Sequence, residues 1–318
     1  MSAGADQTRL FYNGGDGTFE SEQLNLFGLD ALPLYTRSRV VDLDGDAVAD
    51  IIGWGAAGAV VYLGARDSSF SRFGGDNPIV GDTAAVAVFD ADRSGTVDLF
   101  LGKALGSELH LVAGPGAIAA ADRPVAWEFG DRGAIPLDYD GDTRDDLLVY
   151  GQQGIRLVRG TADGFEDTDG AALGLPEVGA VSHAQVVDVD GDGDLDIVVA
   201  GVDGLRVVRS NRVGRVANPM ITLDIRREKQ PDPIEGQRQR DAVGTTVLLD
   251  YDGGAELDAM RALIPHPATP SPITLGDAAQ INVGVRFIDK GGIGSNQRRF
   301  VGEEGLTTGA EQTVYGRE

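Results

Sequence analysis

An aspartate-rich segment of nine residues occurs four times along the chain, and its spacing constrains the fold more than any other sequence feature. The four copies begin at Asp42, Asp90, Asp138 and Asp188, which are 48, 48 and 50 residues apart. A short apolar run follows each copy, as Ile197 to Val199 follows the last. A fixed period in this range indicates repeated supersecondary units, as in propellers and other arrays. We therefore expect at least four equivalent units in tandem.

Oxygen-bearing side chains occupy positions 1, 3, 5 and 9 of every segment. Alternate residues of a tight loop can turn toward one centre, and Gly191 and Gly193 permit the sharp bends of the last copy. Carboxylates this close repel one another unless a cation lies among them. A shell of oxygen atoms suits a hard cation, and the number and flexibility of the ligands favour Ca²⁺ over Mg²⁺. The predicted side-chain ligands are Asp42, Asp44, Asp46, Asp50, Asp90, Asp92, Ser94, Asp98, Asp138, Asp140, Asp142, Asp146, Asp188, Asp190, Asp192 and Asp196.

A turn stabilised by its own aspartate side chains is the alternative interpretation of each segment. This alternative carries most weight for the second copy, where Ser94 replaces an acid and Arg93 replaces a glycine. The fourth copy, which has all four acids and two glycines, is expected to bind Ca²⁺ best, and the second copy worst.

The runs that flank each segment are short, β-branched and bounded by glycine, so we expect them to be strands. An EF-hand loop lies between two helices and fits this pattern poorly. About four short strands per unit is the propeller pattern, and the units run over residues 37–84, 85–132, 133–181 and 182–210.

The segment from Thr8 to Phe19 matches only the second half of such a unit. The chain is therefore expected to begin inside a repeat. The alternative is a propeller whose first blade is completed by a C-terminal strand.

Residues 8 to about 210 resemble the FG-GAP/VCBS repeats of the integrin α-subunit propeller and of many secreted bacterial proteins. The resemblance is carried by Val41-Asp-Leu-Asp-Gly-Asp-Ala-Val-Ala-Asp-Ile-Ile-Gly53 and its three sister segments. It implies an all-β fold, a complete or partial β-propeller, in which the backbone carbonyl at position 7 of each loop also binds Ca²⁺. The residues that supply these carbonyls by this resemblance are Val48, Thr96, Arg144 and Asp194.

The character of the sequence changes after Ser210, so we expect one domain over residues 1–210 and a smaller β domain over residues 211–318. The second part resembles the ASPIC/UnbV domain that follows such repeats in secreted proteins. The matching pieces are Arg240-Asp-Ala-Val-Gly244, Arg299-Phe-Val-Gly302 and Val314-Tyr-Gly316.

Composition excludes several classes of partner. The net charge of −23, from 50 acidic and 27 basic residues, argues against nucleic acid and anionic membranes as partners. No run approaches the length of a transmembrane helix, so we expect no membrane insertion. The start of the chain lacks the basic and apolar regions of a signal peptide. Loops of this type nevertheless favour an extracellular or cell-surface location, where millimolar Ca²⁺ fills weak sites.

The sequence lacks a Gly-x-Ser-x-Gly elbow, a P-loop and a His-Glu-x-x-His motif, and its three histidines lie far apart. We therefore expect a protein that is not an enzyme and that uses a Ca²⁺-stabilised propeller for binding or adhesion, with a protein or glycan ligand. The alternative is a polysaccharide-active enzyme or a lectin on the same scaffold, and the residues of the central channel would distinguish the two.

Overall fold

The described part of the chain consists of strands and the turns between them. In this computed structural model the described residues are 9–13, 17–23, 35–46, 48–67, 69–73, 82–103, 106–114, 118–120, 131–161, 164–190, 194–210, 220–228, 239–241, 246–250, 261–263, 271–274, 282–286 and 311–317. No helix occurs within these ranges. The expectation of an all-β fold is therefore confirmed.

Four successive antiparallel sheets occupy the repeat region, and each follows the order of its strands in the sequence. The first contains β3 (Tyr35–Val41), β4 (Asp50–Gly55), β5 (Gly58–Gly64) and β6 (Phe70–Arg72). The second contains β7 (Thr83–Phe89), β8 (Asp98–Lys103), β9 (Glu108–Val112) and β10 (Ile118–Ala120). The third contains β11 (Gly133–Leu137), β12 (Asp146–Gly151), β13 (Gly154–Thr161) and β14 (Gly164–Asp167). The fourth contains β15 (Val181–Val187), β16 (Asp196–Gly201) and β17 (Gly204–Val208).

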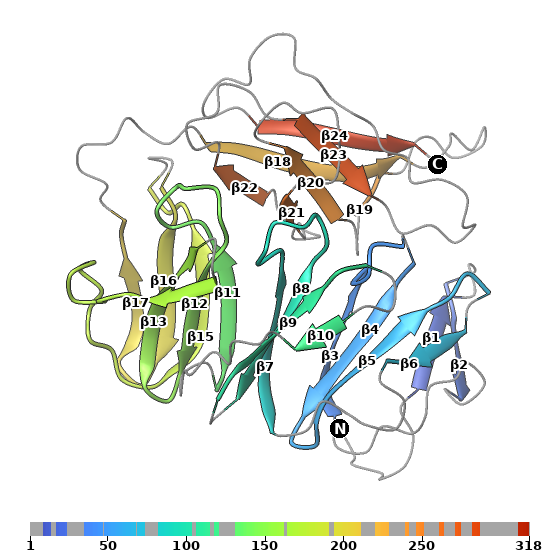
Figure 1. Ribbon diagram of the computed structural model, residues 1–318, viewed down its shortest axis with the longest axis horizontal. Helices are drawn as coiled ribbons and strands as arrows, with labels where there is room; N and C mark the ends of the chain where they lie inside the picture. Colours follow the sequence, from blue (N-terminus) through green and yellow to red (C-terminus); the bar gives the residue numbers. More distant parts are fainter. Residues whose placement is uncertain are drawn as a thin grey trace.

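The sheets follow one another across the molecule as propeller blades do (Figure 1), and adjacent sheets touch through their first two strands. Side chains of the second strands alternate between the two faces of each sheet, as the pleat requires. In β12, Leu147 and Val149 pack into the core shared with the second sheet, whereas Leu148 and Tyr150 pack into the core shared with the fourth. Because both faces are covered, β12 is buried along its whole length.

The N-terminal strands β1 (Arg9–Asn13) and β2 (Phe19–Gln23) form an antiparallel pair of their own. Among the described strands, neither β1 nor β17 pairs with a strand from residues 220–317. The alternative in which a C-terminal strand completes the first blade is therefore not seen in this part of the chain.

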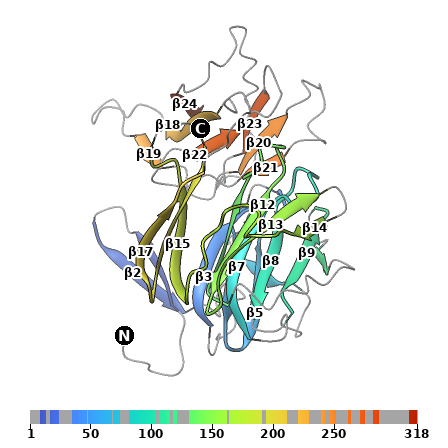
Figure 2. The same cartoon turned by 90° about the vertical axis from the view of Figure 1, so that its left-hand side faces the viewer.

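The strands of residues 220–317 form two further sheets, which lie beyond one end of the blades in both views (Figures 1 and 2). In one sheet, β18 (Met220–Glu228) pairs antiparallel with β19 (Gln239–Asp241) and β22 (Ser271–Thr274), and parallel with β24 (Glu311–Arg317). In the other, β20 (Thr246–Asp250) lies between β21 (Arg261–Leu263) and β23 (Asn282–Arg286). The mixed pairing distinguishes this region from the antiparallel blades.

Replacement of Phe100 by alanine tests the importance of the core between the second and third sheets. Phe100 is fully buried, whereas Phe11 in β1 is 61% exposed. Because truncation of a buried phenylalanine loses apolar contacts and leaves a cavity, Phe100→Ala should lower the free energy of unfolding by about 3–5 kcal/mol. The matched change Phe11→Ala should cost less than about 1 kcal/mol. Urea unfolding followed by circular dichroism measures both, and equal costs would contradict the assigned core.

Candidate metal centres

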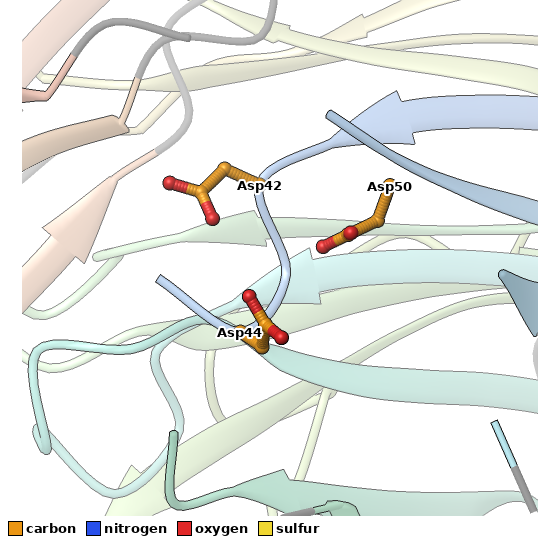
Figure 3. Close-up of side chains that lie close together, drawn as sticks. All are labelled: Asp42, Asp44 and Asp50. Atoms are coloured by element: carbon orange, nitrogen blue, oxygen red, sulfur yellow. The ribbon is translucent and has the colours of Figure 1, made fainter. Parts of the chain in front are cut away.

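The four aspartate-rich loops occupy equivalent places in the four sheets, since each connects the first strand of its sheet to the second. Three carboxylates converge in every loop, and in each set one oxygen per residue lies within 4.8 Å of the others. Figure 3 shows the first set, in which the side chains of Asp42, Asp44 and Asp50 face a common space. The remaining sets are Asp90, Asp92 and Asp98; Asp138, Asp140 and Asp146; and Asp188, Asp190 and Asp196.

The aspartate at position 9 joins two distant parts of its blade. Asp50 Oδ2 accepts a hydrogen bond of 2.7 Å from the backbone N–H of Leu43, and its Oδ1 accepts one of 2.8 Å from the N–H of Gly64 in the third strand. The same pair of hydrogen bonds recurs in the other three loops, to Ala91 and Val112, to Tyr139 and Gly160, and to Val189 and Ser210. We call this double hydrogen bond the backbone clamp. Sequence reasoning predicted these aspartates as metal ligands but missed the clamp.

Glycine at the end of the third strand permits the clamp in two of the blades. A Cβ atom on Gly64 would lie 2.3 Å from the carbonyl oxygen of Ala49, and one on Gly160 would lie 2.2 Å from that of Asp145. The chain passes so close at these points that a side chain would collide with the loop. A glycine 22 residues after the first aspartate was the available sequence signal for this contact.

Burial raises the pKa of the clamp carboxylates in the first three loops. Asp50 has a pKa of about 7, and Asp98 and Asp146 have pKa values of about 8. In each case desolvation is the largest cause, the two backbone N–H donors oppose it, and the acids at positions 1 and 3 add repulsion. The clamp thus holds a carboxyl group whose charge is costly without a nearby cation.

The side chains at positions 1, 3 and 5 also accept hydrogen bonds from the backbone of their own loop. Asp138 accepts from Gly141 at 2.7 Å and from Thr143 at 3.0 Å, and Asp142 accepts from Arg144 at 2.9 Å. The turn interpretation is therefore correct as a description of local structure. It does not compete with metal binding, because a carboxylate oxygen has a second lone pair for a cation.

The position-5 and position-7 residues lie in the loops as expected, but their part in metal binding stays a prediction. The converging carboxylate sets contain positions 1, 3 and 9, and do not include Asp46 or Asp142. Ser94 Oγ lies 2.8 Å from Thr96 Oγ1. Asp192 lies outside the described residues, as do Gly191 and Gly193. The carbonyl ligands implied at Val48, Thr96, Arg144 and Asp194 are likewise untested.

At position 4 the second loop carries a backbone cost that the first and third loops reduce with glycine. Position 4 adopts a left-handed conformation in each of the first three loops, with φ of 80° at Gly45, 62° at Arg93 and 72° at Gly141. This region is unfavourable for residues that have a Cβ atom. The arginine at position 4 is thus tolerated in the second loop at the cost of local strain.

Two arginines contact aspartates of the third and fourth loops: Arg159 in β13, and Arg209 directly after β17. Arg159 Nε lies 2.7 Å from Asp140 Oδ2, and its Nη2 lies 3.2 Å from Asp142 Oδ2. Arg209 Nη1 lies 3.0 Å from Asp190 Oδ2. Sequence reasoning missed both contacts. The signal that could have found them is an arginine 21 residues after the first aspartate in the last two copies.

Part of the chain matches a known family of repeats. The model of the FG-GAP-like repeat matches residues 138–199, which include the third and fourth loops. The repeat part of the resemblance is thereby supported. A comparison with curated proteins found no match.

Several solved structures resemble the chain distantly. A lectin of Agrocybe aegerita that recognises non-reducing terminal N-acetylglucosamine is 15% identical, over 93% of this chain and 89% of the lectin, with a TM-score of 0.43. The V. cholerae biofilm matrix protein Bap1 is 13% identical, over 93% of this chain and 61% of Bap1, with a TM-score of 0.37. A Photorhabdus luminescens Tc holotoxin pore structure is 18% identical over 63% of this chain, with a TM-score of 0.36, and this chain spans 10% of its length. Resemblance at this level carries no conclusion about function.

The raised pKa values predict how pH changes the stability of the metal-free protein. An aspartate in the unfolded chain has a pKa of about 3.9, so between that pH and 7–8 the folded state holds protons that the unfolded state has released. This contribution is complete below about pH 4 and is lost as the pH rises through the folded pKa. With excess chelator, the melting temperature at about pH 8.5 should therefore be roughly 5 °C or more below that at about pH 5.5. The fall should be smaller in Ca²⁺, since the cation replaces the protons. A melting temperature in chelator that is constant or rises over this range would contradict the prediction.

Proposed function

We propose that this chain is a calcium-binding repeat protein that acts in binding or adhesion outside the cell. The observation that carries the proposal is the convergence of three carboxylates at the same place in four successive blades. A single acidic cluster is common on protein surfaces. Four equivalent clusters, two of them within a matching FG-GAP-like repeat, favour a common ligand.

The chemistry of the loops suits Ca²⁺. Each converging set offers oxygen atoms alone, and the carboxylates of the first set are almost fully buried, with Asp42 2%, Asp44 5% and Asp50 0% exposed. Buried acids with raised pKa values bind a divalent cation in place of protons. Ca²⁺ would neutralise the repulsion within each loop, and the position-9 clamp would pass this stabilisation to the third strand.

Two further groups are proposed to complete the Ca²⁺ coordination shell. They are the side chain at position 5, which is an aspartate or Ser94, and the backbone carbonyl at position 7. Ca²⁺ accepts six to eight oxygen ligands, so three carboxylates leave room for both groups. The aspartates of this proposed set are Asp46, Asp142 and Asp192, the last of which lies outside the described residues. The carbonyls of Val48, Thr96, Arg144 and Asp194 complete it.

An extracellular or cell-surface location is proposed because weak Ca²⁺ loops fill at millimolar concentrations. The described residues include no helix with the length and apolar composition needed to cross a membrane. The strongly negative charge makes a protein or glycan a more suitable partner than nucleic acid. Residues 211–318 are proposed to be an ASPIC/UnbV-like β domain beside the propeller.

An enzyme on the same scaffold is the weaker candidate. Outside the loops, the described residues bring together Lys103, Glu108 and His110 on neighbouring strands of the second sheet. Lys103 Nζ lies 2.5 Å from Glu108 Oε1, and His110 Nε2 lies 3.1 Å from Glu108 Oε2. Burial alone would raise the pKa of Glu108, but the hydrogen bonds from Lys103 and His110 lower it. A carboxylate held ionised in this way is a poor proton donor, so the cluster favours a structural ion pair over acid catalysis.

Calcium should stabilise the fold through these loops. A ligand that binds only the folded state adds about 2.7 kcal/mol per site at a hundredfold excess over Kd. We expect chelation to lower the melting temperature, and Asp44→Asn to reduce the response of the protein to Ca²⁺. The control Asp67→Asn changes an acid outside the loops that bonds to Ser69, and should leave the response unchanged. Differential scanning calorimetry with and without Ca²⁺ tests this, and equal melting in millimolar Ca²⁺ and in chelator would refute the metal site.

The binding role is tested separately with a glycan array probed in Ca²⁺ and in chelator. A glycan-binding propeller should give signals that fall when the metal is removed, because the loops then lose their fixed geometry. Release of reducing ends from arrayed polysaccharides would instead support the enzyme. An array without any signal would leave a protein ligand as the proposed partner and would contradict the glycan.

A further inference from the structure

The third and fourth loops each have an arginine side chain at the same position of the repeat. Arg159 is the residue 21 positions after Asp138, and Arg209 is the residue 21 positions after Asp188. Each immediately precedes the residue whose N–H completes the backbone clamp, which is Gly160 in β13 and Ser210 just after β17. The fold therefore directs both guanidinium groups to the same place relative to the converging carboxylates. The equivalent residues of the first two copies are Leu63 and Leu111, which carry no charge.

Arg159 engages two predicted ligands at once. It pairs with the Oδ2 atoms of Asp140 and Asp142, while the Oδ1 atoms of these residues accept hydrogen bonds from the N–H groups of Asp142 and Arg144. All four carboxylate oxygens thus have a partner within the protein. The negative charge of Asp140 raises the pKa of Arg159 further above its ordinary value, so the guanidinium stays charged at every physiological pH.

We propose that Arg159 and Arg209 are built-in counter-ions that hold the position-3 carboxylates in the metal-free state and weaken Ca²⁺ binding at the third and fourth loops. The proposal rests on the proposed calcium function and specifies how its sites differ. A guanidinium stabilises the empty loop, because it offsets part of the repulsion among the acids. It also destabilises the Ca²⁺-bound loop, because Ca²⁺ must share or displace the hydrogen bonds of the guanidinium and is repelled by its positive charge.

The arginines change the order of affinities that the acids alone would give. The sequence alone places the fourth loop first, since it combines four ligand aspartates with two glycines. Arg209 removes part of that advantage through its contact with Asp190. The third and fourth loops are then stable when empty and respond to high Ca²⁺ concentrations. The molecule would thus contain sites of graded affinity within one repeated framework.

The third loop contains a natural reporter for this test. Tyr139 occupies position 2, where the other loops have Leu43, Ala91 and Val189, and it lies within electrostatic reach of Asp140, Asp142, Asp146 and Arg159. A tyrosine near a bound Tb³⁺ ion sensitises its luminescence, so displacement of Tb³⁺ by Ca²⁺ reports the occupancy of this loop. The variant Tyr139→Phe removes this sensitiser, so any Tb³⁺ luminescence that remains comes from other sites.

The decisive variant is Arg159→Gln, studied in the full chain. Its apparent Kd for Ca²⁺ at the third loop should fall about tenfold, the change that Coulomb's law gives for charges of +1 and +2 roughly 6 Å apart in water. Its melting temperature in chelator should fall below that of the wild type, so the shift on adding Ca²⁺ should widen. Arg159→Lys, which keeps the charge, should remain close to the wild type in both measurements.

Arg156→Gln is the matched control, because Arg156 lies on the same strand and pairs with Asp167 in β14. It should leave the Ca²⁺ affinity of the third loop unchanged. An unchanged or weaker affinity in Arg159→Gln would overturn the proposal and make the arginine a group that orients the ligands. Absence of Ca²⁺ binding in the wild type would overturn the proposed function itself, a result visible before any variant is compared.

Discussion

The backbone clamp at position 9 of each loop is the interaction on which the rest of the structure depends. A single buried carboxylate connects the start of the loop, the second strand and the end of the third strand, with N–H donors at 2.7 to 2.9 Å in all four blades. Hydrogen bonds to an ionised carboxylate are about twice as strong as neutral ones, so the clamp is firmest when the acid is charged. Burial opposes that charge, and a cation in the loop favours it. Strand geometry and the proposed metal binding are thereby linked through one side chain.

The loops and the positions of their strands could be predicted from the sequence because the pattern is local. Positions 1, 3, 5 and 9 lie within nine residues, and the apolar runs that follow specify the second strands directly. The clamp could not be predicted, since its second donor lies 14 residues beyond the aspartate and becomes a neighbour only when β4 and β5, or β12 and β13, pair in register. Arg159 was missed for the same reason. The parallel pair of β18 and β24 joins residues such as Ile225 and Val314, too far apart in sequence for any local pattern to indicate.

The effect of the net charge depends on where the acidic residues lie, and the loops contain several of them. A net charge of −23 would repel polyanions if it lay at the surface. Part of it lies in acids that are buried, among them Asp50, Asp98 and Asp146, each 0% exposed. Such acids contribute to the field of the protein only when they are ionised, and their ionisation depends on what occupies the loops. Solubility, long-range attraction and stability are therefore not independent properties of this chain.

Burial along the repeat is decided by neighbouring sheets more than by the sequence of a strand. The residue 19 positions after the first aspartate is Val61, Leu109, Leu157 or Val207, which is apolar in every copy. The first three are 2%, 7% and 4% exposed, whereas Val207 is 48% exposed. Equivalent positions in a repeat differ in this way because each unit buries its faces against the units beside it. The apolar side chains of β17, including Leu205 at 74% exposure, therefore follow from the place of the fourth sheet in the array. They are the core residues of a blade with one covered face, and by themselves they do not indicate a ligand site.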